Sequence, residues 1–201
     1  MATIRLSRNE DLDALYAVCL QTSDAGKDAT HLHDDPMLPG HVFVAPYSVL
    51  EPELCFVAED DEGVGGYIVG AYDTPTFDER AEREWWPSLR ERYPEPDHAR
   101  GPVWTQDEWK RFFLYYPITG EPHVVADYPS HLHIDLLPRL QGRGVGRALM
   151  DTFLDALRAR GSRGVYLGVS PVNQHAIGFY RRYGFDTLVA NEAQVVFVMA
   201  L

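Results

Sequence analysis

The feature that most constrains this chain is a glycine-rich turn between an alternating segment and an amphipathic one. The turn reads Gln141-Gly142-Arg143-Gly144-Val145-Gly146-Arg147, and it follows a predicted strand, His131 to Leu137. Gly144 to Arg160 is a predicted helix because its apolar residues recur at helical spacing. Glycines let the backbone turn tightly, and a helix N-terminus offers free N–H groups with partial positive charge. The turn therefore predicts a cradle for a diphosphate, with Arg143 and Arg147 as cationic partners.

Two other phosphate-binding loops do not fit these residues. The dinucleotide fingerprint needs a third glycine three positions after the second, where this chain has Arg147. The P-loop needs a terminal Gly-Lys-Ser/Thr, which the turn lacks. Taken alone, the turn is also compatible with a glycine-rich surface loop that binds nothing.

A second informative segment follows one strand later. Asn173 to Tyr183 is a predicted helix that ends at Gly184. Asn173, Ile177 and Tyr180 fall on one face of this helix, which combines an amide, an apolar contact and a phenol. By itself the pattern also fits an ordinary amphipathic helix, capped by Asn173 and packed through Tyr180.

The rest of the chain predicts an α/β fold with a sheet of mixed strand direction. Ser7 and Glu10 form a predicted capping box for a helix that ends near Leu20. Residues 73–127, rich in proline and holding all four tryptophans, are expected to be an insertion with a helical patch near Glu79 to Arg92. The other predicted strands are Thr3 to Leu6, Leu54 to Glu59, Val64 to Tyr72, Gly164 to Val169, Phe185 to Val189 and Gln194 to Leu201.

Length and composition limit the classes of protein to which this chain can belong. With 201 residues the chain can bury one core but hardly two, so a single domain over residues 1–201 is expected. The net charge of −12 argues against a nucleic-acid partner and favours a cationic substrate such as an amine, although it also serves solubility alone. No apolar run approaches the roughly 18 residues of a membrane helix, and residues 1–5 lack a signal peptide's apolar stretch. Cys19 and Cys55 lie among apolar residues, so a reducing, cytoplasmic location is expected.

Together the two motifs resemble the acetyl-coenzyme A site of the GNAT superfamily of N-acetyltransferases. The pairing is Gln-Gly-Arg-Gly-Val-Gly with Asn…Ala…Phe-Tyr…Gly-Phe, one strand apart. The resemblance implies the GNAT fold, which is a mixed, mostly antiparallel central sheet flanked by helices. It also implies acetyl-CoA-dependent transfer of an acetyl group to a primary amine.

A wider similarity covers most of the chain. Residues 52–60, 65–67, 86–93 and 161–164 resemble the acetyltransferase-like C-terminal domain of animal O-GlcNAcase, of which this chain looks like a free-standing bacterial relative. The phosphate loop is degraded in that animal domain and intact here, so the resemblance implies cofactor binding. It also leaves open a pseudo-acetyltransferase, which would bind acetyl-CoA or a partner protein without turnover.

The resemblance assigns roles to matching positions of this sequence. It places the backbone of Leu136 and Leu137 along the pantetheine arm, and the turn from Gln141 to Arg147 on the diphosphate. Asn173 and Ala176 would also contact the cofactor, and Tyr180 would approach the thioester sulfur.

Acetyl transfer to an amine needs a base, because a lysine-like amine has a pKa of about 10.4. His131, His133 and Asp135 alternate onto one side of the predicted strand beside the loop. Asp135 and His133 are therefore base candidates, directly or through water; equally, these side chains could bond one another and organise the core. A backbone N–H near Leu136 could stabilise the oxyanion, and Tyr180 could donate to the leaving thiolate. Direct transfer is expected because neither cysteine lies near the expected position of the thioester.

Weaker features leave alternatives open. The segment His31-Leu32-His33-Asp34-Asp35 has metal-ligand residue types, but a solvated loop without metal is expected. The aromatic residues of the insertion either line an acceptor pocket or pack the insertion down, and the second is favoured. They are Trp85, Trp86, Trp104, Trp109, Tyr115 and Tyr116. The acceptor is expected to be a small-molecule or peptide amine, and a homodimer through the insertion is open.

Overall fold

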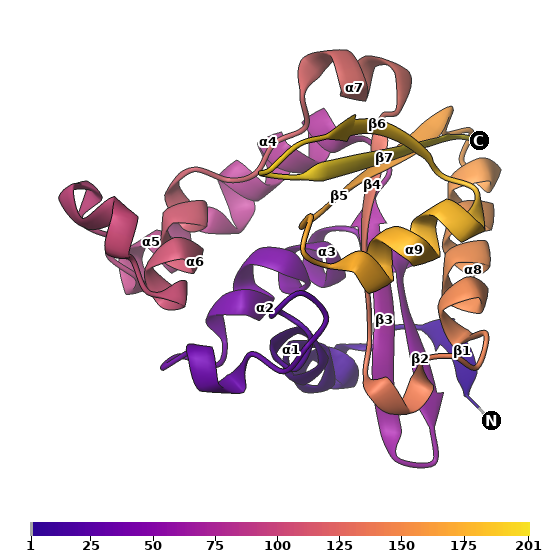
Figure 1. Cartoon of the computed structure of the whole chain (residues 1–201), viewed down its shortest axis with the longest axis horizontal. Helices are drawn as coiled ribbons and strands as arrows, with labels where there is room; N and C mark the ends of the chain where they lie inside the picture. The colour runs from indigo at the N-terminus through magenta and orange to yellow at the C-terminus, as the bar shows by residue number, and fades with distance from the viewer. Residues whose placement is uncertain (1) are drawn as a thin grey trace.

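A seven-stranded sheet forms the centre of the molecule in a computed structural model that describes residues 2–201, residue 102 in its backbone alone. The first residue of the predicted domain therefore lies outside the described residues. The strand order is β1-β2-β3-β4-β5-β7-β6, with β4 and β5 parallel and every other neighbouring pair antiparallel (Figure 1). The strands are β1 (Thr3–Leu6), β2 (Cys55–Asp60), β3 (Gly63–Ala71), β4 (Ser130–Leu136), β5 (Gly164–Val169), β6 (Asp186–Ala190) and β7 (Val195–Ala200). This mixed, mostly antiparallel sheet confirms the predicted fold class.

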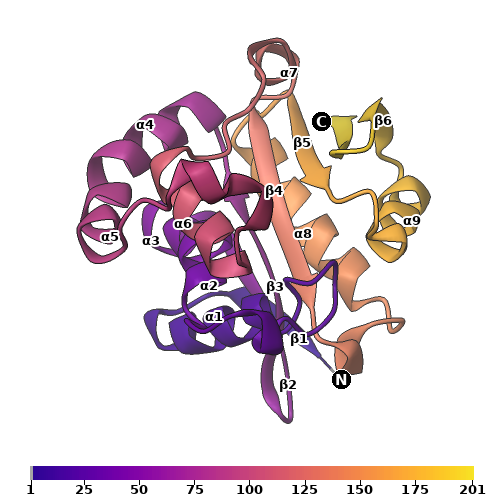
Figure 2. The ribbon, with the colours of Figure 1, turned by 60° about the vertical axis from the view of Figure 1, so that its left-hand side comes forward.

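Helices cover both faces of the sheet (Figures 1 and 2). Helices α8 and α9 pack on one face, and α1 to α6 pack on the other. The helices are α1 (Leu12–Leu20), α2 (Leu38–Phe43), α3 (Ala45–Leu50), α4 (Thr74–Glu84), α5 (Trp86–Arg92), α6 (Gln106–Tyr115), α7 (Pro122–Asp127), α8 (Val145–Ala159) and α9 (Gln174–Tyr183). None of the helices among the described residues is long and apolar enough to cross a membrane.

Alternation along the central strands sends side chains into two cores. On β3, Tyr67 joins the core beneath α1 to α6, and Ile68 joins the core beneath α8 and α9. On β4, Leu132 belongs to the second core, whereas His133 faces Tyr47 of α3 on the first side. The predicted polar stripe of β4 therefore lies on the α1–α6 face, as the period of two requires.

The predicted capping box at Ser7 and Glu10 is wrong. The chain leaves β1 through a short 3₁₀ turn, η1 (Asn9–Asp11), and Arg8 precedes that turn as its cap. The Asp11 carboxylate accepts a hydrogen bond from the Arg8 backbone N–H at 2.7 Å. Arg5 fixes the same carboxylate through two hydrogen bonds. Asp11 replaces Glu10 because the extra turn moves the start of α1 toward the C-terminus by one residue or more.

In the insertion at 73–127, the one helical patch predicted near Glu79 to Arg92 is divided into two helices, and α6 and α7 follow it. α4 ends at Glu84 and α5 begins at Trp86. Pro87 lies in the first turn of α5, where its missing N–H is tolerated, whereas it would break the interior of one continuous helix. Trp86 and Leu89 of α5 are buried in the same core as α1 and β3.

Strands β4 and β5 stay paired over two residues only. Ser130 pairs with Val165 and His131 pairs with Tyr166, after which the ladder stops. Figure 2 shows the two strands side by side at their start and apart toward their ends. The backbone of β4 from Leu132 onward therefore has an open edge on the β5 side, and we call this opening the splay.

Candidate functional site

The glycine-rich turn leads into α8 in a conformation that suits an anion. Gly142 and Gly144 have φ values of 70° and 80°, in the left-handed region that glycine adopts without strain. From Gly142 to Arg147, no backbone N–H donates to another residue within 2–201. Buried Val145 anchors the first turn of the helix. The turn therefore presents a row of free N–H groups at a helix N-terminus, and a diphosphate fits such a row.

Arg139 fixes the segment that precedes the glycine-rich turn. Its guanidinium donates to Asp60 at 3.2 Å and to the Gly63 carbonyl at 3.1 Å. It lies directly over Gly65, where a Cβ atom would come within 2.5 Å of the guanidinium. The hairpin of β2 and β3 thus fixes the segment that enters the phosphate turn.

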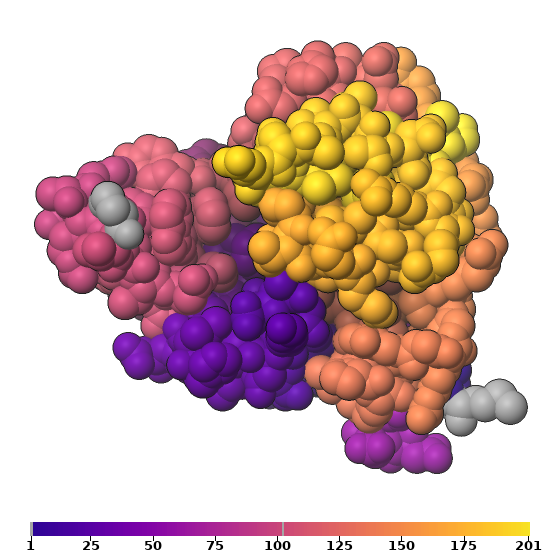
Figure 3. All heavy atoms as spheres, viewed as in Figure 1, coloured from indigo at the N-terminus to yellow at the C-terminus, as the bar shows by residue number. Residues whose placement is uncertain are grey.

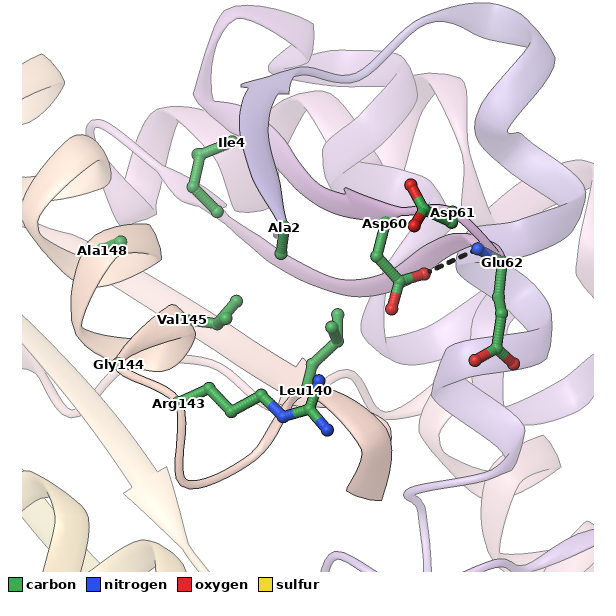
Figure 4. Close-up of a pocket in the computed structure, with 10 residues that line it drawn as sticks. All are labelled: Ala2, Ile4, Asp60, Asp61, Glu62, Leu140, Arg143, Gly144, Val145 and Ala148. Carbon is green, nitrogen blue, oxygen red and sulfur yellow. Dashed lines mark hydrogen bonds between the residues drawn. The ribbon is translucent and has the colours of Figure 1, made fainter.

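A cavity of about 570 Å³ lies beside the turn on its outer side (Figure 4). The Arg143 side chain extends along it, opposite the acidic turn Asp60, Asp61 and Glu62. Three carboxylates would repel a diphosphate from this side. The free N–H groups, rather than this cavity, are therefore the anion-binding feature of the turn.

The pairing of β4 with β3 determines which backbone N–H groups of β4 face the splay. The Leu137 N–H donates to Gly65 O at 2.8 Å, and the Leu137 carbonyl accepts from Leu140 N–H at 3.0 Å. In an antiparallel ladder, neighbouring residues point their N–H groups to opposite sides. The Leu136 N–H therefore faces the splay. The Leu136 carbonyl accepts from the Gln141 side chain at 2.8 Å. Of the predicted pantetheine contacts, Leu136 has a free N–H, whereas both polar backbone groups of Leu137 are occupied.

Helix α9 borders the splay from the other side. The Asn173 side chain caps this helix by accepting from Ala176 N–H at 3.1 Å, as the sequence allowed. Tyr180 is 6% exposed, and its hydroxyl has no hydrogen-bond partner among the described residues. Burial raises the pKa of Tyr180, and the Asp135 charge raises it further. Tyr180 is thus a protonated donor with a free hydrogen.

Four side chains on the α1–α6 face form a hydrogen-bonded chain. Thr74 Oγ1 lies 2.7 Å from His131 Nδ1, and Tyr47 Oη lies 2.9 Å from His131 Nε2 and 3.1 Å from His133 Nε2. Thr74 Oγ1 also donates to the Pro129 carbonyl at 2.8 Å. Tyr47 and Thr74 were missed in the sequence, since they lie 84 and 57 residues from His131 along the chain.

The Pro129 carbonyl gives one direction to the protons in this chain. A carbonyl only accepts, so when the Thr74 hydroxyl donates to it, Thr74 accepts from His131 Nδ1–H. Burial lowers the pKa of His131 to about 3 and that of His133 to about 4, so both rings are neutral at pH 7. His131 Nε2 then accepts from Tyr47, and Tyr47 accepts from His133 Nε2–H. His133 Nδ1 is left as an unprotonated nitrogen with a free lone pair.

Asp135 is the other base candidate of the stripe. The Tyr67 hydroxyl donates to Asp135 Oδ2 at 2.6 Å. Burial raises the pKa of Asp135, and the Tyr67 hydrogen bond partly offsets this. Asp135 and His133 are two residues apart on one side of β4, so they border the same space.

Figure 3 shows a recess where the segment around α5 and α6, the N-terminal helices and the C-terminal segment meet. Phe43 lies on this side, with its ring centroid 5.8 Å from that of His133, and Phe113 lies 6.4 Å from Phe43. Trp86 is buried in the core instead, and Trp104 packs against Trp109 at 4.9 Å. The tryptophans thus mainly pack the insertion, and the aromatic residue beside His133 is Phe43, which sequence reasoning missed.

The segment His31–Asp35 is tied to α6. His33 Nδ1 lies 2.6 Å from Asp107 Oδ1, and the backbone N–H groups of Asp34 and Asp35 donate to the other oxygen. In the part of the chain that the structure describes, no three His, Cys, Asp or Glu side chains are grouped to hold a metal ion.

The fold is that of the GNAT class of acetyltransferases. The Acetyltransferase (GNAT) family model matches residues 20–185, so the chain belongs to this family. Protein O-GlcNAcase of Rattus norvegicus is 27% identical over 182 residues, which make up 90% of this chain. They make up 20% of the rat protein, so the chain spans about a fifth of that relative.

Two solved structures are similar to the whole chain. SsHAT has 40% sequence identity and a TM-score of 0.90, with 99% of this chain and 98% of SsHAT covered. YncA of Salmonella typhimurium, whose structure contains its cofactor acetyl-CoA, has 15% identity and a TM-score of 0.56. That comparison covers 100% of this chain and 94% of YncA, and at this identity it supports the fold alone.

Proposed function

We propose that this protein is an acetyl-CoA-dependent N-acetyltransferase that transfers acetyl directly to a primary amine. The observation that carries the proposal is the row of free N–H groups from Gly142 to Arg147, next to the splay. The turn would hold the diphosphate, and Arg147 would add positive charge. Leu136 N–H would bind along the pantetheine arm or at the thioester oxygen, with Asn173 and Ala176 across the splay. Bound acetyl-CoA supplies the activated acetyl group as a thioester.

The stripe on β4 would handle the amine and its proton. Asp135, which accepts a hydrogen bond from Tyr67, would in its ionised form attract the ammonium form of the acceptor. The ammonium first loses one proton to solvent to give the free amine. As its nitrogen bonds the acetyl carbon it becomes far more acidic, and His133 Nδ1, the free lone pair at the end of the hydrogen-bonded chain, then accepts the second proton. The chain cannot conduct this proton onward, because it ends on the Pro129 carbonyl. Its role is to fix the tautomer of His133, and the proton must leave His133 to solvent.

Tyr180 would act on the leaving group. Because burial raises its pKa, the phenol stays protonated, and full transfer of its proton to a thiolate is uphill. The free hydroxyl would instead donate a hydrogen bond to the sulfur. Cys19 and Cys55 are buried, and burial raises the pKa of both thiols, so neither is suited to carry the acetyl group as a thiolate nucleophile.

Thermal unfolding with coenzyme A and acetyl-CoA tests the cofactor site. A ligand that binds the folded state alone at 100 times its dissociation constant adds about 2.7 kcal/mol of stability. We expect this stabilisation in the wild type and its loss in Gly144→Glu, whose carboxylate would lie in the anion site. No stabilisation by either ligand at millimolar concentration would contradict the proposal.

Release of free thiol from acetyl-CoA tests catalysis separately. We expect release that depends on an added amine and on acceptor concentration. Binding of acetyl-CoA without amine-dependent release, over a broad panel of amines and peptides, would instead identify a pseudo-acetyltransferase.

A further inference from the structure

Lys110 is a buried lysine that forms no ion pair with any of the described residues. It lies on the core-facing side of α6, one turn before fully buried Leu114, and is itself 9% exposed. No carboxylate oxygen of the described residues lies within 4 Å of its ammonium, which is 5.3 Å from the ring centroid of Phe43. A lysine at this depth is rarely left unpaired, because burying a charge costs free energy that a partner must offset.

The two acidic residues of α6, Asp107 and Glu108, bind other partners. Asp107 accepts one hydrogen bond from His33 and two from backbone N–H groups of the preceding loop. Glu108 pairs with Arg100 at 3.0 Å and caps the helix through Thr105. Neither carboxylate pairs with Lys110, although the Asp107 charge raises the pKa of Lys110 against the larger, lowering effect of burial. Among the described residues, no anion is therefore in direct contact with the Lys110 ammonium.

The Lys110 ammonium lies near the same aromatic ring as His133. It is 5.3 Å from the ring centroid of Phe43, and that centroid is 5.8 Å from the centroid of the His133 ring. Asp135 follows His133 by two residues on the same side of β4. Phe43 therefore connects Lys110 to the base candidates of the proposed reaction centre.

Solvent reaches this ammonium. Among the described residues, the unpartnered side-chain atoms that are fully enclosed are His41 Nε2 and Arg111 Nε. Lys110 Nζ also lacks a hydrogen-bond partner but is not enclosed, so a small polar ligand can touch it. The ammonium lies 5.3 Å from the ring centroid of Phe43 in α2.

We propose that Lys110 binds an anionic group, a carboxylate or a phosphate, of the acetyl acceptor while the acceptor amine lies at His133 and Asp135. The inference rests on the proposed function and narrows the acceptor to amines that also carry an anion, such as amino acids or amino sugar phosphates. The net charge of −12 gives no long-range attraction for such an anion, so the local contact with Lys110 must select it.

Calorimetric titration of matched amines tests this site without needing turnover. The protein is saturated with coenzyme A and titrated with two matched pairs of amines. In the first pair glucosamine 6-phosphate carries a phosphate that glucosamine lacks, and in the second lysine carries a carboxylate that 1,5-diaminopentane lacks. We expect the anion-bearing member of at least one pair to bind about tenfold more tightly, a charge-assisted contact of ordinary strength. The pair that shows the preference distinguishes phosphate from carboxylate. The preference should disappear in Lys110→Met and persist in Lys27→Met, the exposed second lysine of the chain.

Several outcomes would overturn the assignment. They are equal affinity for both members of each pair, absence of binding by any anion-bearing member, or an unchanged preference in Lys110→Met. An acetyl group found on Lys110 after incubation with acetyl-CoA alone would make it an acceptor instead. Unliganded Lys110→Met should unfold at the wild-type temperature or above it, because no internal ion pair is lost; a large decrease would indicate a structural role. Preferential binding of the anion-bearing amines without thiol release would support the anion site and contradict the proposed acetyl transfer.

Discussion

The Tyr67 hydroxyl donates a 2.6 Å hydrogen bond to Asp135, across the paired strands β3 and β4. This bond lowers the pKa of Asp135 against the opposing effect of burial. In Tyr67→Phe the pKa of Asp135 should therefore rise, and the acidic limb of kcat/KM against pH should move to higher pH. Loss of a hydrogen bond to a charged group costs about 1.5–3 kcal/mol, so kcat/KM at neutral pH should fall at least tenfold.

Tyr72→Phe is the matched control for that change. The Tyr72 hydroxyl donates to the Arg160 carbonyl, away from β4, and its loss should leave the pH profile unchanged. An acidic limb at the same pH in wild type and Tyr67→Phe would mean that Asp135 does not govern the rate.

Tyr47 should set the tautomer of His133. We expect ¹⁵N spectra to show His131 protonated at Nδ1 and His133 protonated at Nε2. Tyr47→Phe removes the acceptor that holds the His133 proton, so the second tautomer should become populated. General acid–base catalysis contributes roughly 10²–10⁴-fold, and we expect kcat to fall tenfold or more with the KM for acetyl-CoA nearly unchanged. A wild-type His133 protonated at Nδ1 would contradict the proton order derived from Pro129.

The contrast between these residues explains what the sequence could predict. The glycine turn, the alternation of β4 and the Asn173 cap depend on neighbours within a few residues, so local pattern was enough. Tyr47 lies in short helices of a segment without clear periodicity, and it reaches His131 only because α3 packs across the sheet. The burial of Lys110 was equally unpredictable, because a lysine on an amphipathic helix normally faces water. The fold was therefore largely predictable, whereas the partners of the stripe on β4 depended on tertiary packing.

Tyr180→Phe should separate chemistry from binding. The substitution removes a hydroxyl without a protein partner, so stability and the KM for acetyl-CoA should hardly change. If the hydroxyl stabilises the leaving sulfur, kcat should fall about tenfold or more, the equivalent of one hydrogen bond of roughly 1.4 kcal/mol. Tyr183→Phe, one turn later and bonded to Asp151, serves as the control. Equal single-turnover rates in wild type and Tyr180→Phe would remove Tyr180 from the mechanism.

The buried histidines should make the protein sensitive to mild acid. Burial lowers the pKa of His131 to about 3 in the folded chain, against about 6.5 for an unperturbed histidine. Between these values the unfolded chain binds the proton and the folded chain does not, so stability is complete above about pH 6.5 and falls below it. One histidine contributes a slope of about 1.4 kcal/mol per pH unit. Urea unfolding should therefore give a steeper slope for wild type than for His131→Gln by about this amount.

The comparison of slopes isolates His131 from other buried groups. The pKa values of Asp78 and Asp135 are raised by burial, which gives a slope of the opposite sign, but both groups are present in both proteins. If wild type and His131→Gln lost stability equally over this range, His131 would have to take up a proton while folded. The direction of the hydrogen-bonded chain from Pro129 to His133 would then be lost together with the free Nδ1 on which the proposed proton transfer depends.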